Sequence, residues 1–304
     1  MFLYLPVALT SINTLIILGV GLSIGLLSGL FGVGGGFLIT PILMMLGISP
    51  TVAAASGANQ MVAASASGTY THWKMGHVDI KMGAFLLAGS FLGGFLGVYA
   101  IAALKAVGNA DFIIKLTYVL VPTTVGTYMF VESMQSLKRK KLSGIEDNAP
   151  KKESAFKRFL KSLPYQIDFE KSGVRHSFLL PIIIGILVGV LAAIMGVGGG
   201  FIMVPIMLYL LDMPILVVVG TSLFQILFTV IEVTFLSAYT NHTVDFTLAL
   251  IMLIGSSIGA QLGTIASKKM NADKLKILLA ILILGIGIKV LSELTLRPPI
   301  RLTF

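Results

Sequence analysis

Charge is absent from the first 73 residues of this chain, in which Lys74 is the first charged side chain. Over all 304 residues the charged fraction is 12%, whereas average soluble proteins carry roughly a quarter. Apolar residues make up 56% of the chain, and the mean hydropathy is +0.96. This composition excludes an ordinary soluble domain and predicts an all-α polytopic membrane protein.

Cysteine is also absent, which excludes disulfides, thiolate nucleophiles and thiolate metal ligands. No His-Glu-x-x-His motif is present, so a zinc protease is excluded. Ser65, Ser67 and His72 fall on one predicted helix, but their spacing does not establish a nucleophile and base in contact. We therefore expect no enzyme activity, no cofactor and no metal. The N-terminus lacks the positive region of a secretory signal, so its apolar run is expected to be a retained span.

Positive charge is concentrated in one segment, since residues 136–176 hold 11 of the 22 Lys and Arg residues. Such a local excess is typical of a membrane-orientation signal, and nucleic acid is not an expected partner. The positive-inside rule then predicts that this linker lies in the cytoplasm, in a multi-pass protein of the inner membrane. With an even number of spans in each half, both termini are expected in the cytoplasm as well, with a pseudo-two-fold axis along the membrane normal.

Apolar stretches long enough to be membrane spans recur along the chain, since a hydrocarbon core of about 30 Å needs roughly 20 helical residues. Two shorter apolar stretches, 37–46 and 201–211, follow glycine runs and are expected to be half-helices. Eight predicted spans lie near residues 8–31, 51–73, 82–104, 112–134, 177–195, 216–240, 246–267 and 275–292.

An internal repeat organises these spans. The hexapeptide of residues 32–37, Gly-Val-Gly-Gly-Gly-Phe, recurs unchanged at residues 196–201, an offset of 164. Further pairs extend the match: Pro41 with Pro205 at an offset of 164 residues, Gln60 with Gln225 at an offset of 165, and Asp79 with Asp245 at an offset of 166. The repeat predicts a first four-span half over residues 1–135, a basic linker over 136–176, and a second four-span half over 177–304.

The glycine runs are the first candidates for substrate contact. A glycine turn before a half-helix exposes N–H groups that have no partner within the helix, and the helix dipole favours an anion there. Broken helices near the midplane form the substrate site in many transporters. Close helix packing is the alternative, and we favour it for Gly89, Gly93 and Gly97. The candidates for substrate contact are Gly34, Gly35, Gly36, Gly198, Gly199 and Gly200.

Neutral polar side chains follow each half-helix. Amides and hydroxyls inside an uncharged span are costly unless they have partners, and they can donate to an oxyanion while remaining neutral. Hydrogen bonds between helices are the alternative role. The candidate substrate contacts are Ser56, Asn59 and Gln60 in the first half, and Thr221, Ser222 and Gln225 in the second.

Glu232 is an acid well inside a predicted span, and an ionisable group at that depth is a functional hypothesis by default. Proton coupling is one role, and a structural hydrogen bond or an ion pair with Lys115 or Lys289 is the other. The first half has no acidic counterpart, because Ala66 or Ser67 falls at the equivalent position.

The segments Phe31–Pro41 and Met195–Pro205 together resemble the paired signature of the sulfite exporter TauE/SafE family. The resemblance implies a secondary transporter, expected to export sulfur-containing anions such as sulfite or organosulfonates. Composition and spacing alone do not indicate sulfur. A passive anion channel and a transporter of non-sulfur organic acids stay open as alternatives. The expected partners are a small anion and the lipid bilayer, with a second copy of the chain as a further candidate.

Overall fold

The computed structural model describes residues 2–143, 164–267 and 272–296. Helices run through most of this part of the chain, and two short antiparallel hairpins precede two of them. The first-half elements are β1 (Phe2–Leu5), β2 (Thr10–Asn13), α1 (Thr14–Phe31), α2 (Gly36–Met45), α3 (Pro50–Lys74), α4 (Ile80–Ala106) and α5 (Ala110–Ser143). The second-half elements are β3 (Gln166–Phe169), β4 (Val174–Ser177), α7 (Leu179–Met195), α8 (Gly200–Pro205), the π-helix η1 (Ile206–Leu210), α9 (Ile215–Leu236), the π-helix η2 (Ser237–Asn241), α10 (Phe246–Ser267) and α11 (Ala272–Leu296).

Helices occupy the eight long apolar stretches, and α2 and α8 with η1 occupy the two short ones. Among the described residues, five helical segments are long and apolar enough to cross a membrane: α1, α4, α5 as far as Glu132, α9 with η2, and α10. The helical membrane fold is therefore supported. That α3, α7 and α11 also lie in the membrane stays a prediction, because α3 is rich in small and polar residues and the apolar parts of α7 and α11 are shorter.

The two hairpins were not expected from the sequence, so the all-α description is incomplete. The strands β1 and β2 take up the start of the predicted first span, and α1 begins only at Thr14. The strands β3 and β4 lie 164 residues after β1 and β2, so they extend the repeat. Both ends of the predicted linker are ordered, in α5 and in the second hairpin, while residues 144–163 lie outside the described residues.

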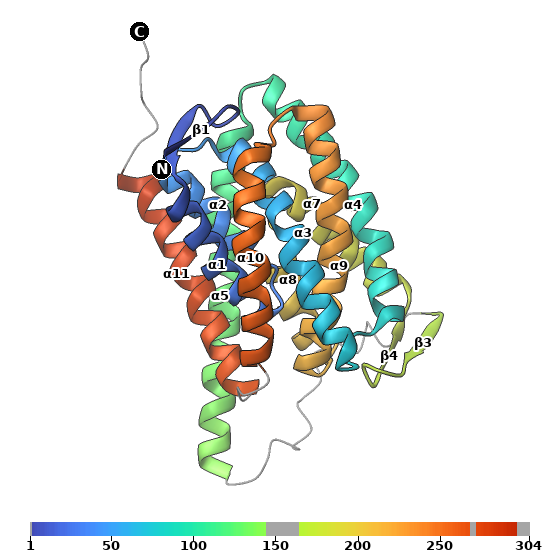
Figure 1. Cartoon of the computed structure of the whole chain (residues 1–304). Coiled ribbons are helices and arrows are strands. Elements are labelled where there is room, and N and C mark those ends of the chain that lie inside the picture. The colour runs from blue at the N-terminus through green and yellow to red at the C-terminus, as the bar shows by residue number, and fades with distance from the viewer. Residues whose placement is uncertain (1, 144–163, 268–271, 297–304) are drawn as a thin grey trace.

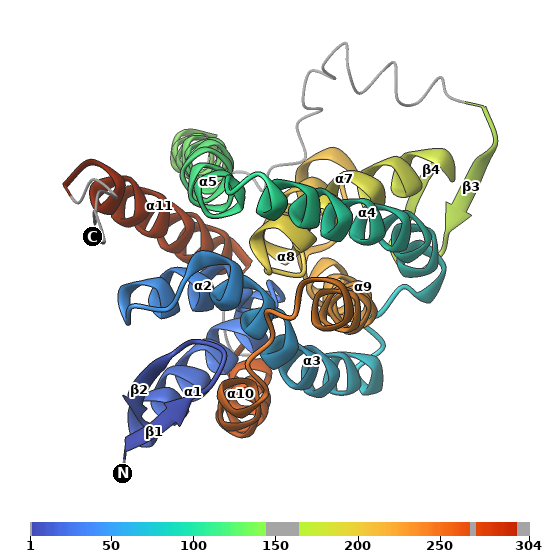
Figure 2. The same cartoon turned by 90° about the horizontal axis from the view of Figure 1, so that it is seen from above.

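The two sequence halves are interleaved. Figure 2 shows α1 beside α10 and α4 beside α7, on either side of a centre that holds α2, α3, α8 and α9. Small residues allow these close contacts: a Cβ atom at Gly25 would strike the backbone of Ser256, and one at Gly93 would strike the carbonyl of Ile186. The packing role expected for the spaced glycines of α4 is thus confirmed.

The two halves run in opposite directions. Along α1, Gly21 and Gly25 contact Met252 and Ser256 in the same order, so α1 is parallel to α10. In the same way α4 is parallel to α7. The end of α4 meets the end of η2, a few residues before α10 begins, because Lys105 donates a hydrogen bond to the Asn241 carbonyl. Hence α1 and its sequence counterpart α7 are antiparallel (Figure 1).

This arrangement contradicts the expected axis along the membrane normal, and the reason lies in the pair α1–α2. The Ala8 N–H bonds to Asp245, and the Thr51 N–H bonds to Asp111, so both ends of the pair lie on one face of the molecule. The chain therefore enters and leaves through that face, whereas the sequence count treated α1 as a complete crossing. Each half therefore passes from one face of the molecule to the other an odd number of times. The second half thus begins on the face opposite to the first, and the two halves are inverted.

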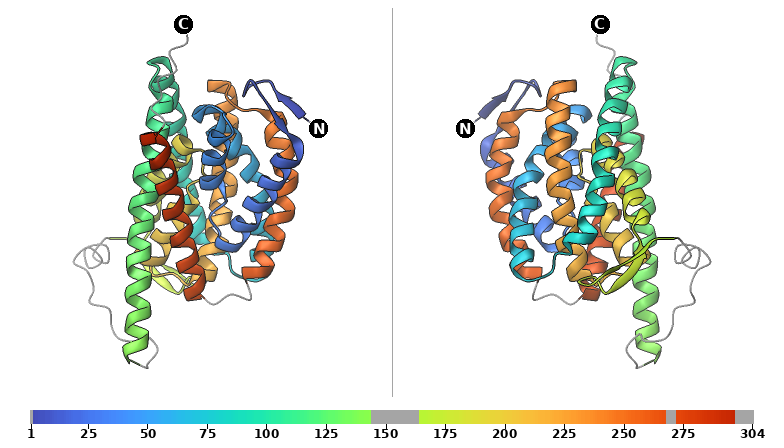
Figure 3. Two further views of the ribbon diagram at one scale, coloured as in Figure 1. Left: turned by 90° about the vertical axis from the view of Figure 1, so that its left-hand side faces the viewer. Right: turned by 90° about the vertical axis from the view of Figure 1, so that its right-hand side faces the viewer.

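The described ends of the chain and the described ends of the linker consequently lie on opposite faces. Figures 1 and 3 show hairpin β1–β2 and the end of α11 at one end of the bundle, and hairpin β3–β4 and the end of α5 at the other. We call these ends the termini face, which includes Thr51 and Asp245, and the linker face, which includes Asp79 and Ser172. The expectation that both termini and the linker share the cytoplasmic side is wrong, for the same reason as the axis.

Candidate functional site

The two glycine turns meet at the centre of the molecule. Gly34 and Gly35 have φ of +76° and +75°, and Gly198 and Gly199 have φ of +62° and +76°. Side chains rarely adopt this left-handed region, so the turns need glycine. The turns also touch: a Cβ atom at Gly36 would lie 2.9 Å from Cα of Val197, and one at Gly200 would strike the Val33 carbonyl.

Each turn leads into a helix that starts without a side-chain cap. Gly35 and Gly199 are the N-cap residues of α2 and α8, and neither supplies a side-chain hydrogen bond. Two side chains from other helices fix the start of the second turn. The hydroxyls of Thr40 and Tyr118 both donate to the carbonyl of Met195, the residue directly before the turn, at 3.3 Å and 2.7 Å. The structure therefore brings together the six glycines singled out in the sequence, in a fixed arrangement.

Most of the predicted polar contacts are hydrogen-bonded within the protein. The hydroxyl of Ser56 accepts from the Asp245 N–H, and that of Thr221 accepts from the Asp79 N–H, each at 2.9 Å. These two bonds are equivalent in the repeat and hold the starts of α10 and α4. Ser222 donates to the Gly32 carbonyl at 2.7 Å. In this conformation the three hydroxyls join helices, which is the alternative role that the sequence left open.

The two glutamines differ. The Gln225 amide donates to Ser90 at 2.7 Å and to Thr229 at 2.8 Å. Gln60 is equally buried, yet neither its amide nitrogen nor its amide oxygen has a hydrogen-bond partner in the described part of the chain. Ala64 takes the place of Thr229 in the first half, so a partner is missing. Buried amides without partners are costly, so Gln60 stands apart from Gln225 in this conformation; Asn59 is half-buried on the same helix.

Glu232 projects from α9 toward Gly94 of α4 and is half-buried. Its Oε2 atom makes no hydrogen bond to any described residue. Within the described ranges Glu232 also forms no ion pair, so the proposed pairing with Lys115 or Lys289 is not observed.

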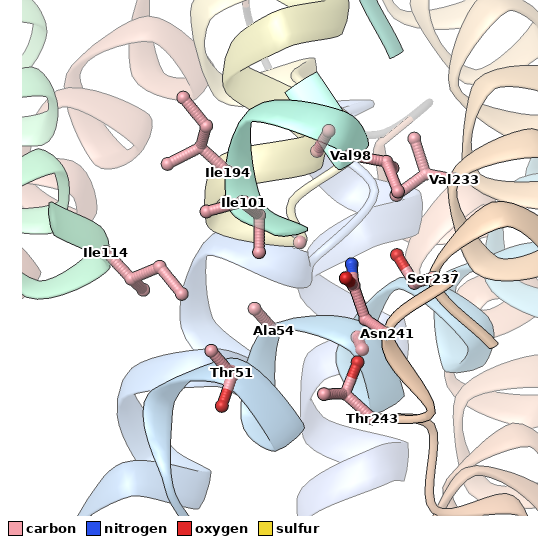
Figure 4. Close-up of a pocket in the computed structure, with 13 residues that line it drawn as sticks. Thr51, Ala54, Val98, Ile101, Ile114, Ile194, Val233, Ser237, Asn241 and Thr243 are labelled. Carbon is pink, nitrogen blue, oxygen red and sulfur yellow. The ribbon is translucent and has the colours of Figure 1, made fainter. Parts of the chain in front are cut away.

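A small cavity lies between the second glycine turn and the termini face (Figure 4). Gly196, which precedes the second glycine turn, is one of its lining residues. The apolar side chains of Val98, Ile101 and Val233 form part of its walls. Polar residues line its outer part: Thr51, Ser237, Asn241 and Thr243. Sequence reasoning missed these four. A signal was present, however, because the repeat offset changes by one residue within the segment that contains Ser237 and Asn241.

Known proteins resemble the chain over nearly its whole length. The probable membrane transporter proteins YjnA and YunE of Bacillus subtilis are each 26% identical to it, over 276 and 292 residues. These matches cover 89% and 91% of this chain, and 97% of each relative. The sulfite exporter TauE/SafE family protein 1 of Arabidopsis thaliana is 30% identical over 103 residues, which are 34% of this chain and 23% of that protein.

No solved structure matches the chain. The family described as sulfite exporter TauE/SafE matches residues 17–290, a range that includes both glycine turns and Gln60, Gln225 and Glu232. With this match over most of its length, the chain belongs to the sulfite exporter TauE/SafE family of membrane transporters.

Proposed function

We propose that the protein is a secondary transporter that exports sulfur-containing anions, such as sulfite or organosulfonates, across the cytoplasmic membrane. Family membership supports the transporter class and the sulfur chemistry. One observation carries the mechanism: two inverted glycine turns touch at the centre, and a cavity reaches one of them from the termini face. Inverted repeats with broken helices at their interface are the architecture of many alternating-access transporters.

The membrane orientation follows from the charges. The linker, whose two described ends lie on the linker face, carries 11 Lys and Arg residues in its sequence, and Lys74 at the end of α3 and Lys81 at the start of α4 lie on the same face. The positive-inside rule then assigns the linker face to the cytoplasm and the termini face to the opposite side. On this proposal all eight long helices lie in the membrane, with α1 and α7 belonging to re-entrant pairs.

Substrate contact is assigned to neutral donors near the glycine turns. The N–H groups of Gly34–Gly36 and Gly198–Gly200 and the amide of Gln60 can bind an oxyanion without a fixed cation, which favours release as well as binding. Gln225 joins the set in a conformation that frees its amide from Ser90. Glu232 is proposed as the proton-coupling residue, because it is an acid within a span and forms no ion pair with any residue that the structure describes.

The moving bodies are proposed to be helix pairs. Residues 1–135 and 177–304 remain the two repeats by sequence, but α1 is packed on α10 and α4 on α7 through backbone contacts. Separating the sequence halves would break both contacts. We therefore infer that the pairs α1–α10 and α4–α7 each move as a unit about the centre during alternating access.

Purified protein in liposomes tests this function. Fluxes of sulfite, methanesulfonate and sulfate are measured with and without a pH gradient. Saturable flux of sulfite or methanesulfonate is expected. Gln60→Leu should raise KM, while the control Thr124→Ala, whose exposed hydroxyl bonds only within its own helix to Leu120, should not. Absence of flux for all three anions would reject the substrate class, and non-saturating flux independent of the gradient would favour a channel.

A further inference from the structure

The two halves differ in length at two places, and each place contains a π-helix. The repeat offset rises from 164 at Pro205 to 165 at Gln225, and to 166 at Asp245. The segment η1 lies in the first interval and η2 in the second, whereas α2 and α3 are regular α-helices. A π-turn has hydrogen bonds from residue i to i+5, so it holds one extra residue without displacing the rest of the helix. The two single-residue insertions of the second half are thus accommodated by η1 and η2.

The insertion in η2 adjoins the cavity. The first and last residues of η2, Ser237 and Asn241, both line the cavity, as does Thr243, two residues after Asn241. Figure 4 shows the Asn241 amide and the Ser237 hydroxyl turned toward its interior. Isolated π-turns in α-helices are rare and are frequent at functional sites.

The equivalent space on the linker face is filled. There α3 stays α-helical to Lys74, and the rings of His72 and His77 lie 5.8 Å apart. Gly220 corresponds to Ala55 of the cavity wall, yet a Cβ atom at Gly220 would strike the His77 carbonyl and lie 3.1 Å from Cβ of His72. The cavity therefore lies beside η2, in the half that carries the extra residue.

A cation lies at the outer edge of the cavity. Lys105, in the last turn of α4, donates from Nζ to the Asn241 carbonyl at 2.7 Å. Its partner is a neutral carbonyl, and among the described residues its ammonium group forms no ion pair with a carboxylate. Its positive charge is thus available to an anion near Asn241. The surface that receives the anion would combine this charge with two hydroxyls and an amide.

We propose that the cavity beneath η2 is a binding site for a small oxyanion on the termini face, and that the one-residue insertion of η2 shapes it. Ser237, Asn241 and Thr243 donate hydrogen bonds to the anion oxygens, and Lys105 supplies the attracting charge at the edge. The identity of the anion rests on the proposed transport function, whereas the location of the site rests on the cavity.

Binding and transport measured on the same variants test this site. Sulfite and methanesulfonate are titrated by calorimetry into the full-length protein in detergent, and transport KM is measured in liposomes. Ser237→Ala, Asn241→Leu and Lys105→Gln should each weaken binding and raise KM about tenfold or more, as expected for loss of one hydrogen bond or charge contact to an anion. Lys105→Gln should also reduce the salt dependence of binding.

Matched controls separate a local effect from misfolding. Lys81→Gln removes a lysine that bonds to the Asp168 carbonyl on the linker face, and Thr124→Ala removes an exposed hydroxyl of α5. Both should bind within about twofold of the unaltered protein, since surface changes usually have small effects. Deleting Tyr239, which is exposed within η2, should restore an α-helical turn and abolish binding.

The outcomes distinguish this site from the proposed function. Normal binding and KM in all three cavity variants, with transport intact in the unaltered protein, would overturn the site and leave the transport function standing. Binding that depends on Ser237 and Asn241 in a protein without flux would support the site and reject transport. Absence of both binding and flux for the two anions would overturn both.

Discussion

The ring of Phe37 stacks on the ring of Phe201, with 5.6 Å between the centroids and 24° between the ring planes. These residues hold the same position in the two hexapeptides, and both are almost fully buried. Their contact joins the first turns of the two half-helices. Because each ring packs on its own repeat equivalent, the pair lies where the inverted halves meet.

Replacing either ring should weaken the centre of the molecule. Phe37→Ala and Phe201→Ala are each expected to lower the free energy of unfolding by about 3–5 kcal/mol, as for other buried Phe to Ala changes. The double variant should lose less than the sum, because the rings share one contact. Unfolding in detergent measures the changes, with the 69% exposed Phe235 replaced as control. Strictly additive losses would show that the rings do not act as a pair.

A second prediction concerns the contact between α1 and α10. Gly25→Ala should force the two helices apart, since the new Cβ atom would strike the Ser256 backbone, and overpacking of this kind costs about 1–3 kcal/mol. Gly19→Ala on the same helix meets no atom within 4 Å. It should be neutral or raise stability by up to about 1 kcal/mol through helix propensity. Thermal unfolding of both variants tests the pair, and equal stabilities would contradict the contact.

The helices were predictable because apolar length and the glycine repeat are properties of the sequence alone. The direction of the repeats was not. A letter-for-letter repeat carries no direction, and whether α1 with α2 crosses the membrane depends on contacts such as those of Ala8 and Thr51. The first hairpin escaped prediction because four-residue strands in an apolar N-terminal run give no clear periodicity.

The candidate site was also predictable only in part, because its turns depend on local sequence and its contacts depend on packing between helices. Glycine runs mark positions where the backbone needs left-handed φ, so the turns followed directly from the sequence. The partners of Ser56 and Thr221 depend on how helices from different halves pack. Asn241 belongs to no recognisable sequence motif. The sequence marked its segment only through the change in repeat offset between Gln225 and Asp245.

Two equivalent aspartates should anchor the two hairpins separately. Asp245 accepts from the Val7 and Ala8 N–H groups, and Asp79 accepts from the N–H and hydroxyl of Ser172. Asp245→Ala should therefore speed amide exchange in β1–β2 and leave β3–β4 unchanged. Asp79→Ala should do the reverse. Hydrogen exchange with mass spectrometry reads both hairpins at once, and faster exchange in both hairpins for either variant would indicate global loosening.

Glu232→Gln tests coupling to protons. The amide keeps the size of the side chain and removes its ability to carry a proton, so flux should lose its dependence on the pH gradient while anion binding persists. Glu170→Gln on the exposed second hairpin is the control. Flux in liposomes at several gradients measures the effect, and an unaltered gradient dependence would remove Glu232 as the coupling residue.

The final prediction concerns orientation, and the absence of native cysteine makes it simple to test. Single cysteines replace Tyr4 on the termini face and Lys171 on the linker face, both exposed. An impermeant maleimide added to intact spheroplasts should label Tyr4→Cys at once, and Lys171→Cys only after the membrane is permeabilised. The unaltered chain provides the background. Labelling of both positions from one side would contradict the inverted halves, while the reverse order would keep the fold and overturn only the assignment of the linker face to the cytoplasm.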